Sequence, residues 1–201
     1  EDGATVECEL FVPHGLSAVA LRWRLTSEHR DLALFVRPFY SGRDYHSLHR
    51  ENGGFRFDPE QQEERLIWHP YPGVPGISVI SNGTYRHEPD WYRRFQYREE
   101  QARGLDGIED LAAPGVFHWP LSEREAVWIV RAELGTDPMR LTATTPEGIY
   151  AELREREVTR RNGFPSRLHR AADAYLVQRK QGMTIVAGND PRILTVEVTD
   201  D

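Results

Sequence analysis

The chain has 201 residues, of which 28% are charged and 39% are hydrophobic, and its formal net charge is −7. This composition is typical of a globular protein with one sizeable core. The sequence lacks the basic patch of a nucleic-acid-binding protein and the long apolar run of a membrane-spanning helix, so we expect neither partner. The acidic start EDGATVECEL does not resemble a secretory signal, and the chain has a single cysteine, Cys8. We therefore expect a cytoplasmic protein.

Alternating apolar and polar residues predict a series of short strands in the first part of the chain. The pattern is clearest over Thr5–Val12 and Ala18–Leu25, which we expect to form an antiparallel hairpin with Cys8 buried on its apolar face. The more continuously apolar Leu32–Tyr40 is expected to be a more central strand. Further strands are predicted at Arg65–Trp68, Ile77–Ile80, Asp90–Tyr97, Val116–Trp119 and Glu125–Glu133.

Turn signals separate these predicted strands. Pro70–Gly76 is a proline-rich loop that cannot pair as a central strand. The dipeptide at 82–83, Asn-Gly between two apolar runs, is a strong hairpin signal, so we expect the strand that begins near Thr84 to turn back antiparallel on the strand before it. Glu99–Leu105 is predicted to form a turn or two of helix, and Ala113–Gly115 is predicted to end that segment.

The pattern becomes helical toward the C-terminus. Thr145–Glu147 has a hydroxyl cap followed by proline and an acid, which predicts a helix that continues to Arg161. Ser166 is expected to cap a second helix that continues to about Lys180, and a last strand is predicted at Ile193–Val198. Strands followed by helices favour a mainly β fold, an antiparallel two-sheet β-sandwich with a C-terminal helical segment.

The stretch from His87 to Gly115 has the most distinctive composition. It combines an aromatic run threaded with arginines and a following acidic segment: Trp91, Tyr92, Phe95, Tyr97, then Asp106, Glu109 and Asp110. Aromatic faces beside charged hydrogen-bonding groups are typical of a sugar site. The same composition also describes an ordinary strand with one buried face, which is the commoner case. We expect the aromatic half on a strand and the acidic half on a helical turn or loop.

Candidates for catalytic or metal-binding chemistry are few. His46 and His49 with Asp44 have helical spacing in a region that reads as strand or loop, and a second ligand pair is missing, so we predict no metal and no cofactor. Glu109 and Asp110 are adjacent, which does not suit the paired carboxylates of a glycosidase. We expect them to accept hydrogen bonds from arginine or from backbone amides. The sequence has no phosphate-binding glycine loop and no serine-hydrolase motif.

Three segments carry a family resemblance: RDYHSL (Arg43–Leu48), EPDWYRRFQYREEQARGLDGIEDLAAPGVF (Glu88–Phe117) and AADAYLVQRKQGMTIVAG (Ala171–Gly188). In order and spacing they resemble the N-terminal part of bacterial and archaeal glycogen debranching enzymes of the amylo-α-1,6-glucosidase type. Their most specific part is D-W-Y-x-x-F-x-Y followed by R-G-L-D and E-D-L. The resemblance implies an N-terminal β-supersandwich and a helical toroid with the catalytic acids, in a protein of glycogen breakdown.

The chain departs from the family pattern at both ends. It lacks the T-N-G-x-G-G-type opening, and after Gly188 it lacks the W-G-R-D-T segment that opens the catalytic domain. We therefore carry over no catalytic residue and expect a chain that is inactive alone: a shortened form, a truncated gene product or a stand-alone descendant. The expected division is a β-sandwich domain at 1–140, a helical linker resembling the entry to the toroid at 141–188, and a divergent tail at 189–201.

Three functions stay open. The first is a non-catalytic sandwich domain that supports an α-glucan or guides it to a catalytic domain. The second is an interaction or assembly domain without sugar affinity, which binds the catalytic helical domain or forms a homo-oligomer. The third and weakest is a mutarotase-like sugar enzyme that uses His46, His87 and Asp90. The candidates for a carbohydrate site or a domain interface are Arg43, Asp44, His46, His87, Asp90, Trp91, Tyr92 and Tyr97.

Overall fold

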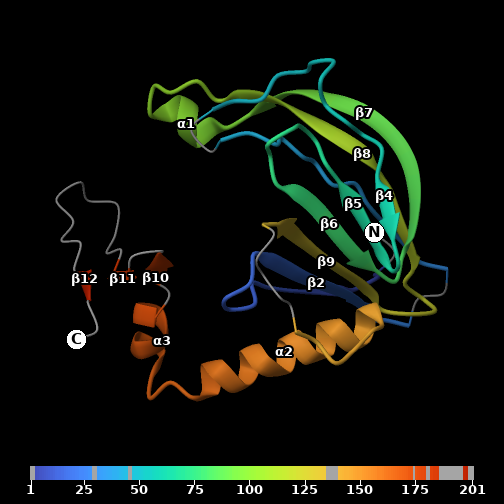
Figure 1. Cartoon of the computed structure of the whole chain (residues 1–201). Helices are drawn as coiled ribbons and strands as arrows, with labels where there is room; N and C mark the ends of the chain where they lie inside the picture. Colours follow the sequence, from blue (N-terminus) through green and yellow to red (C-terminus); the bar gives the residue numbers. More distant parts are fainter. Residues whose placement is uncertain are drawn as a thin grey trace. The chain divides into compact units, whose positions relative to one another are not determined.

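The computed structural model describes residues 3–28, 31–44, 47–134, 140–173, 175–179, 182–185 and 197–198. The chain divides into two compact units, Glu1–Arg154 and Glu155–Asp201. The first unit contains two antiparallel β-sheets that face each other (Figure 1). The predicted mainly β fold, a two-sheet sandwich with a C-terminal helical segment, is therefore confirmed. The three-part division into domains stays a prediction.

In the described part of the chain, the larger sheet has six strands in the order β1-β2-β9-β6-β5-β4. These are β1 (Val6–Phe11), β2 (Ala18–Leu25), β4 (Glu60–Gln62), β5 (Arg65–Trp68), β6 (Gly76–Ser81) and β9 (Ala126–Glu133). All neighbouring pairs are antiparallel. The predicted hairpin of β1 and β2 is confirmed, with Cys8 opposite Trp23.

The smaller sheet has the order β3-β8-β7 and carries the aromatic stretch. Its strands are β3 (Ala33–Val36), β7 (Thr84–Gln96) and β8 (Ile108–Pro120), and the short helix α1 (Arg98–Ala102) connects β7 to β8. The pairing of β7 with β8 shifts register between His87 and Asp90 and again between Tyr92 and Phe95. Such bulges bend a strand, and Figure 1 shows β7 and β8 curving over the larger sheet.

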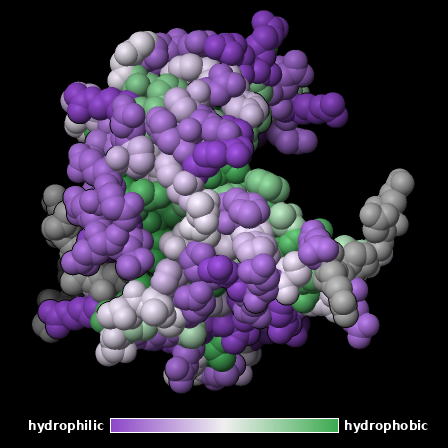
Figure 2. Space-filling view, turned by 90° about the vertical axis from the view of Figure 1, so that its right-hand side faces the viewer, coloured by the Kyte–Doolittle hydropathy of each residue, from purple (hydrophilic) through white to green (hydrophobic). Residues whose placement is uncertain are grey.

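The core fills the space between the two sheets. It consists of buried residues from both of them, among them Trp68, Val79, Phe117, Trp119 and Ala126. Figure 2 shows hydrophobic residues inside a hollow of one face, surrounded by hydrophilic ones. Burial of large apolar side chains is the main favourable contribution to folding, so this layer holds the two sheets together.

The helix α2 (Pro146–Asn162) covers the opposite face of the larger sheet with its first turns. Its residues Ile149, Tyr150 and Leu153 are buried against side chains of that sheet, Phe11, Ala20, Ile80, Val127 and Ile129. The Thr145 hydroxyl accepts a hydrogen bond from the amide of Gly148 at 3.2 Å, as expected of the predicted cap. The predicted start of this helix is therefore confirmed.

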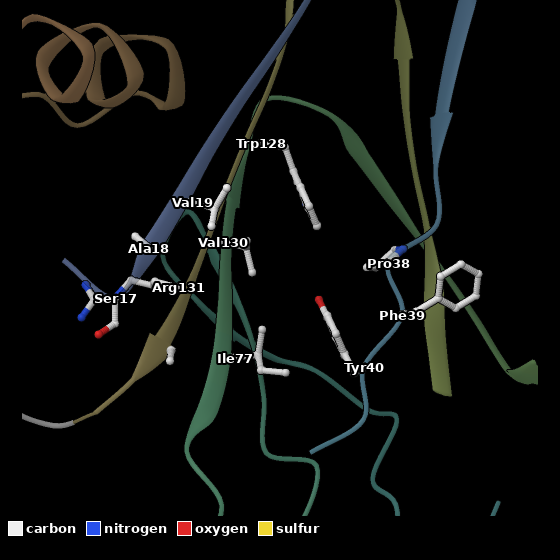
Figure 3. A pocket seen from close by; sticks show the side chains of 11 residues that line it. Ser17, Ala18, Val19, Pro38, Phe39, Tyr40, Ile77, Trp128, Val130 and Arg131 are labelled. Atoms are coloured by element: carbon white, nitrogen blue, oxygen red, sulfur yellow. The ribbon is translucent and has the colours of Figure 1, made fainter. Parts of the chain in front are cut away.

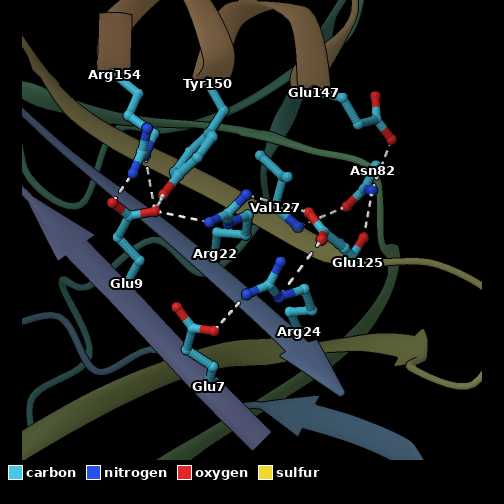
Figure 4. A network of polar contacts seen from close by, with 10 residues as sticks. All are labelled: Glu7, Glu9, Arg22, Arg24, Asn82, Glu125, Val127, Glu147, Tyr150 and Arg154. Carbon is cyan, nitrogen blue, oxygen red and sulfur yellow. Dashed lines mark hydrogen bonds and ion pairs between the residues drawn. The ribbon is translucent and has the colours of Figure 1, made fainter. Parts of the chain in front are cut away.

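A polar network beside this small core fixes α2 to β1 and β2 (Figure 4). The Glu9 carboxylate accepts hydrogen bonds from the Tyr150 hydroxyl, Arg154 Nε and Arg22 Nη2, each at 2.8 Å. Partial burial acts to raise the pKa of Glu9, but the bonds from Tyr150 and Arg154 outweigh it, and the pKa lies below its usual value. Glu9 is therefore a charged anchor for the helix.

Acidification is expected to weaken this anchor. Because the pKa of Glu9 is lower in the folded chain, its contribution to stability is complete above the pKa of the unfolded chain and is lost as pH falls through the folded value. Urea unfolding at pH 7 and at pH 4 should show a stability difference between wild type and Glu9→Gln that shrinks at the lower pH. The control is Glu7→Gln, which removes the exposed pair with Arg24. An equal difference at both pH values would contradict the assignment.

The second unit contains the end of α2, the helix α3 (Arg167–Asp173) and three short strands, β10 (Leu176–Arg179), β11 (Gly182–Ile185) and β12 (Glu197–Val198). The strands form an antiparallel sheet in the order β10-β11-β12. The predicted helix from Ser166 to about Lys180 is wrong in length, because the chain leaves the helix after Asp173 and enters β10. Of the predicted strand Ile193–Val198, residues 193–196 lie outside the described residues.

No helix in the described ranges is long and apolar enough to span a membrane.

Two burial predictions in the first unit are wrong, because β1 and β3 both lie at sheet edges. Cys8 is exposed rather than buried. The face of β1 that α2 covers carries Glu9 and Phe11, so the apolar face with Cys8 lies on the other side. The apolar segment around β3 is not central either. Its continuous apolar pattern includes Phe35, which is 61% exposed, because one face of the strand is open.

The Asn-Gly turn at 82–83 does not close a hairpin. A strand begins at Thr84 as predicted, but it pairs with β8 in the other sheet, while β6 pairs with β5 and β9. The side chain of Asn82 accounts for this difference. Its Oδ1 accepts hydrogen bonds from Trp119 Nε1 and from the Val127 amide, both at 2.8 Å, and its Nδ2 donates to the Glu125 carbonyl at 2.9 Å. These bonds tie the turn to β8 and β9, so the chain crosses between the sheets.

The strand β8 continues through Ala113–Gly115, which was predicted to end the segment. Pro114 lies opposite the bulge between His87 and Asp90, where its missing N–H removes no ladder bond. A Cβ on Gly115 would lie 2.3 Å from the Arg86 carbonyl oxygen, so only glycine fits there. In the acidic half of the aromatic stretch, Glu109 and Asp110 are on this strand and not on a helical turn or loop, whereas Asp106 lies in the loop before the strand, as predicted.

Candidate functional site

A buried carboxylate on β8 joins two of the three segments that carry the family resemblance. Glu109 is fully buried. It accepts hydrogen bonds from Arg43 Nε and Nη2, the latter at 2.9 Å, from the Tyr97 hydroxyl at 2.7 Å and from the His49 amide at 3.1 Å. Arg43 comes from the RDYHSL segment, and Tyr97 comes from the end of the aromatic run. The expectation that Glu109 accepts bonds from arginine and from a backbone amide is confirmed.

The electrostatics of this cluster favour a charged structural anchor. Burial acts to raise the pKa of Glu109, but hydrogen bonds from Arg43, Tyr97 and the His49 amide outweigh it, so the pKa lies below its usual value. The same bond raises the pKa of Arg43. Burial and the bond to Glu109 raise the pKa of Tyr97. An ionised carboxylate of this kind suits positioning rather than proton donation.

The neighbouring Asp110 binds backbone amides instead of an arginine side chain. Its two carboxylate oxygens accept hydrogen bonds from the backbone amides of Glu51 at 3.0 Å and Arg94 at 2.9 Å. These bonds hold the pKa of Asp110 below its usual value. Arg94 has a φ of 63°, an uncommon conformation for a residue with a side chain. Asp110 therefore stabilises the second bulge of β7, while Glu109 serves the cluster around Arg43.

A cavity of about 630 Å³ lies beside the Glu109 cluster. It is lined by Arg43, Ser47, Leu48, Tyr97, Glu100, Leu105 and Asp106. The volume lies in the range of about 300–1,000 Å³ that is usual for small-molecule sites. The lining combines two carboxylates, a guanidinium and two hydroxyl groups with two leucines and an aromatic ring. It therefore offers both directional hydrogen bonds and apolar surface.

A comparison with known protein families identifies the family of this chain. A family model described as glycogen debranching enzyme N terminal matches residues 1–128. The chain belongs to this family. The matched region contains β1 to β8 and therefore the whole Glu109 cluster and its cavity. No curated protein and no solved structure matches the chain.

Within this debranching-enzyme N-terminal domain, the predicted site residues lie in different places. Of the described candidates, Arg43 and Tyr97 line the cavity. Trp91 is half-buried and packs against the core, with its ring 5.2 Å from that of His49. Tyr92 lies elsewhere, 4.9 Å from the ring of Phe39. The register shift after Tyr92 and the alternation of side chains along β7 place these rings in different surroundings.

Of the remaining polar candidates, His87, Asp90 and Asp44 are not among the residues that line the cavity. His87 Nε2 is 3.5 Å from Asp58, and its Nδ1 is 3.1 Å from the Tyr85 hydroxyl. The Asp90 carboxylate accepts a hydrogen bond from the amide of the next residue at 2.7 Å. The Asp44 carbonyl accepts one from the Ser47 amide at 3.0 Å. His46 lies outside the described residues. The roles proposed for these four residues stay predictions.

His49 belongs to the core of the domain. It is buried, its Nδ1 lies 3.0 Å from the Asp110 carbonyl and its Nε2 lies 2.7 Å from the Tyr71 hydroxyl. Burial lowers its pKa. Among the described residues, no group of three or more His, Cys, Asp or Glu side chains is placed to hold a metal ion.

The sequence did not single out Ser47, Glu100 and Leu105 as cavity residues. Glu100 lies in α1 and Leu105 just after it, and the amide of Ser47 donates to the Asp44 carbonyl. The only sequence feature that points to them is their place in the family segments: Ser47 is in the segment of Arg43, and Glu100 and Leu105 are in the segment of Tyr97. The cavity forms because these segments, far apart in sequence, meet at Glu109.

Proposed function

We propose that this domain binds an α-glucan chain without cleaving it, and that it supports or guides the chain toward the catalytic part of a debranching enzyme. The observation that carries the proposal is the cavity at the Glu109 cluster, formed by residues of the matched family region. Sugar hydroxyls form directional hydrogen bonds with carboxylates and guanidinium groups, and their C–H faces pack on rings and aliphatic side chains. The cavity lining supplies both kinds of group.

The Glu109 cluster supports this role because it fixes the cavity wall before a ligand arrives. Arg43 and Tyr97 are both held by Glu109 and do not need to be ordered on binding. A preorganised site loses less conformational entropy when it binds a ligand. Glu100 and Asp106 add carboxylates to the lining and are more exposed, with 37% and 66% of their side chains exposed.

Calorimetric titration with maltohexaose tests the proposed site. The double variant Glu100→Gln/Asp106→Asn keeps the shape of the lining and removes both charges, so it should bind about tenfold more weakly, because hydrogen bonds to charged groups are the stronger ones. The matched control is Glu99→Gln, an exposed neighbour on α1 that should bind like wild type. Wild-type affinity in the double variant would place the sugar elsewhere.

A second candidate function is an interaction domain without sugar affinity. It is favoured by exposed apolar side chains on one face of β1 and just after it, Val6, Leu10 and Val12, of which Leu10 is 59% exposed. Apolar surface of this kind often marks a protein interface. Light scattering over a concentration series would show self-association that Leu10→Lys abolishes. A monomer at all concentrations, together with maltohexaose binding, would favour the sugar-binding function.

A further inference from the structure

A second cavity, of about 400 Å³, lies between the larger sheet and the segment that follows β3 (Figure 3). Its walls come from β2, β6, β9 and residues 38–40, and they are mostly apolar: Ala18, Val19, Pro38, Phe39, Tyr40, Ile77, Trp128, Val130 and Ala132, with Ser17 and Arg131. It shares no lining residue with the cavity at Glu109. The guanidinium of Arg131 is paired with Glu133 at 3.4 Å. The lining therefore favours an uncharged ligand.

Two buried polar atoms of this lining have no hydrogen-bond partner among the described residues. They are the Tyr40 hydroxyl and Trp128 Nε1. Tyr40 is only 6% exposed, and Figure 3 shows its hydroxyl and the Trp128 ring pointing into the cavity from two different segments. Burial raises the pKa of Tyr40, so its phenol stays a neutral donor. Buried polar groups almost always have partners, and an unpaired one is unfavourable.

The two fully buried tryptophans of the core, Trp68 and Trp119, both have a partner for the indole N–H. Trp68 Nε1 donates to the Phe57 carbonyl at 3.0 Å, and Trp119 Nε1 donates to Asn82 at 2.8 Å. Trp128 differs from both, and it differs where its ring lines a cavity. An apolar occupant would leave both donors unpaired. The occupant that completes the cavity therefore has oxygen acceptors as well as an apolar face.

We propose that this cavity is a second sugar site, which holds a single glucosyl unit. The C–H face of the sugar packs against Trp128, and its oxygens accept hydrogen bonds from the Tyr40 hydroxyl and from Trp128 Nε1. Neutral donors beside aromatic faces are the chemistry that recognises an uncharged pyranose. The choice of glucose rests on the proposed function, whereas the cavity and its two unpaired donors do not. With the cavity at Glu109, it gives the domain two separate contacts for one glucan.

Titration of the unaltered protein with maltose, followed by the indole N–H signals in NMR spectra, tests the proposal. The chain has five tryptophans, and the Trp128 signal is identified by its loss in Trp128→Phe. We expect this signal to shift saturably with maltose, while the signals of Trp68 and Trp119 stay in place. Tyr40→Phe keeps the ring and removes one donor, so it should weaken the affinity reported by this signal about threefold to tenfold.

The double variant Glu100→Gln/Asp106→Asn separates the two sites. It should leave the maltose response of Trp128 unchanged while it weakens maltohexaose binding in the calorimeter. A Trp128 signal that stays in place at saturating maltose, with maltohexaose binding intact, would overturn this second site and leave the proposed function standing. A shift of the Trp128 signal with cyclohexanol equal to that with maltose would also overturn it, because the cavity would then be a general apolar site.

Discussion

Replacing Glu109 by alanine is expected to lower the free energy of unfolding by about 3–5 kcal/mol. The loss is large because the variant leaves the Arg43 charge, the Tyr97 hydroxyl and the His49 amide without their shared acceptor. Glu109 itself is fully buried, and Arg43 has only 23% of its side chain exposed, so water replaces these bonds poorly. Equilibrium unfolding in urea measures the difference.

Two further variants show whether this effect comes from the buried charge. Glu109→Gln keeps the shape and one acceptor oxygen, so we expect a smaller loss than in Glu109→Ala. Glu51→Ala breaks an exposed ion pair with Arg93 and should leave the unfolding midpoint nearly unchanged. Wild-type stability in Glu109→Ala would contradict the view that this carboxylate holds the cavity wall together. Maltohexaose binding should fall with Glu109→Ala even where the variant is folded, because Arg43 and Tyr97 lose their positions.

Replacing Asn82 by alanine is expected to cost about 2–4 kcal/mol. The variant leaves the indole N–H of the fully buried Trp119 and the Val127 amide without an acceptor, and it also removes the bond to the Glu125 carbonyl. Because this side chain connects the turn to strands of both sheets, we expect the near-ultraviolet circular dichroism of the core tryptophans to change as well. Urea unfolding and the dichroism spectrum measure the two effects.

The matched control for this prediction is Asn52→Ala. Asn52 is exposed, and its Nδ2 donates to the Arg50 carbonyl and the Tyr71 hydroxyl. Asn52→Ala should lower the free energy of unfolding much less than Asn82→Ala, since water can replace those bonds. Equal destabilisation by the two substitutions would show that the crossing between the sheets does not depend on Asn82.

The sequence predicts those elements whose pattern is local. The bounds predicted for Ala18–Leu25 and Arg65–Trp68 are those of β2 and β5. The order of apolar and polar residues along a strand reflects which of its faces is buried, and this pattern is local. The helix start at Thr145 is likewise a matter of adjacent residues. What the sequence does not reveal is partner choice. The turn at 82–83 has the composition of a hairpin, but side-chain bonds to Trp119 and Val127 direct the next strand into the other sheet.

The same distinction holds for strand position and for the long strand β8. An apolar segment does not show whether one of its faces stays open, as at Phe35 on the edge strand β3. Pro114 predicts the end of a strand, because proline has no backbone N–H to donate a hydrogen bond to a neighbouring strand. It is accommodated only because the partner strand bulges opposite it, which no local pattern shows.

The candidate sites were predictable in part. The composition and the family resemblance selected Arg43 and Tyr97, and adjacency argued that Glu109 is a structural acceptor. Ser47 and Glu100 join them only through the meeting of two distant segments. Tyr40 and Trp128 gave no signal in the sequence, because a missing hydrogen-bond partner is a property of the folded chain.

The most direct test of sugar binding is a calorimetric titration of the unaltered protein with maltohexaose, with β-linked cellohexaose as the control. Binding to the wall of Tyr97, Glu100 and Asp106 predicts saturable heat with the α-linked chain and much weaker heat with the β-linked one, since the two polymers present their hydroxyls in different directions. No saturable heat with maltohexaose, or equal affinity for both sugars, would contradict an α-glucan-binding domain.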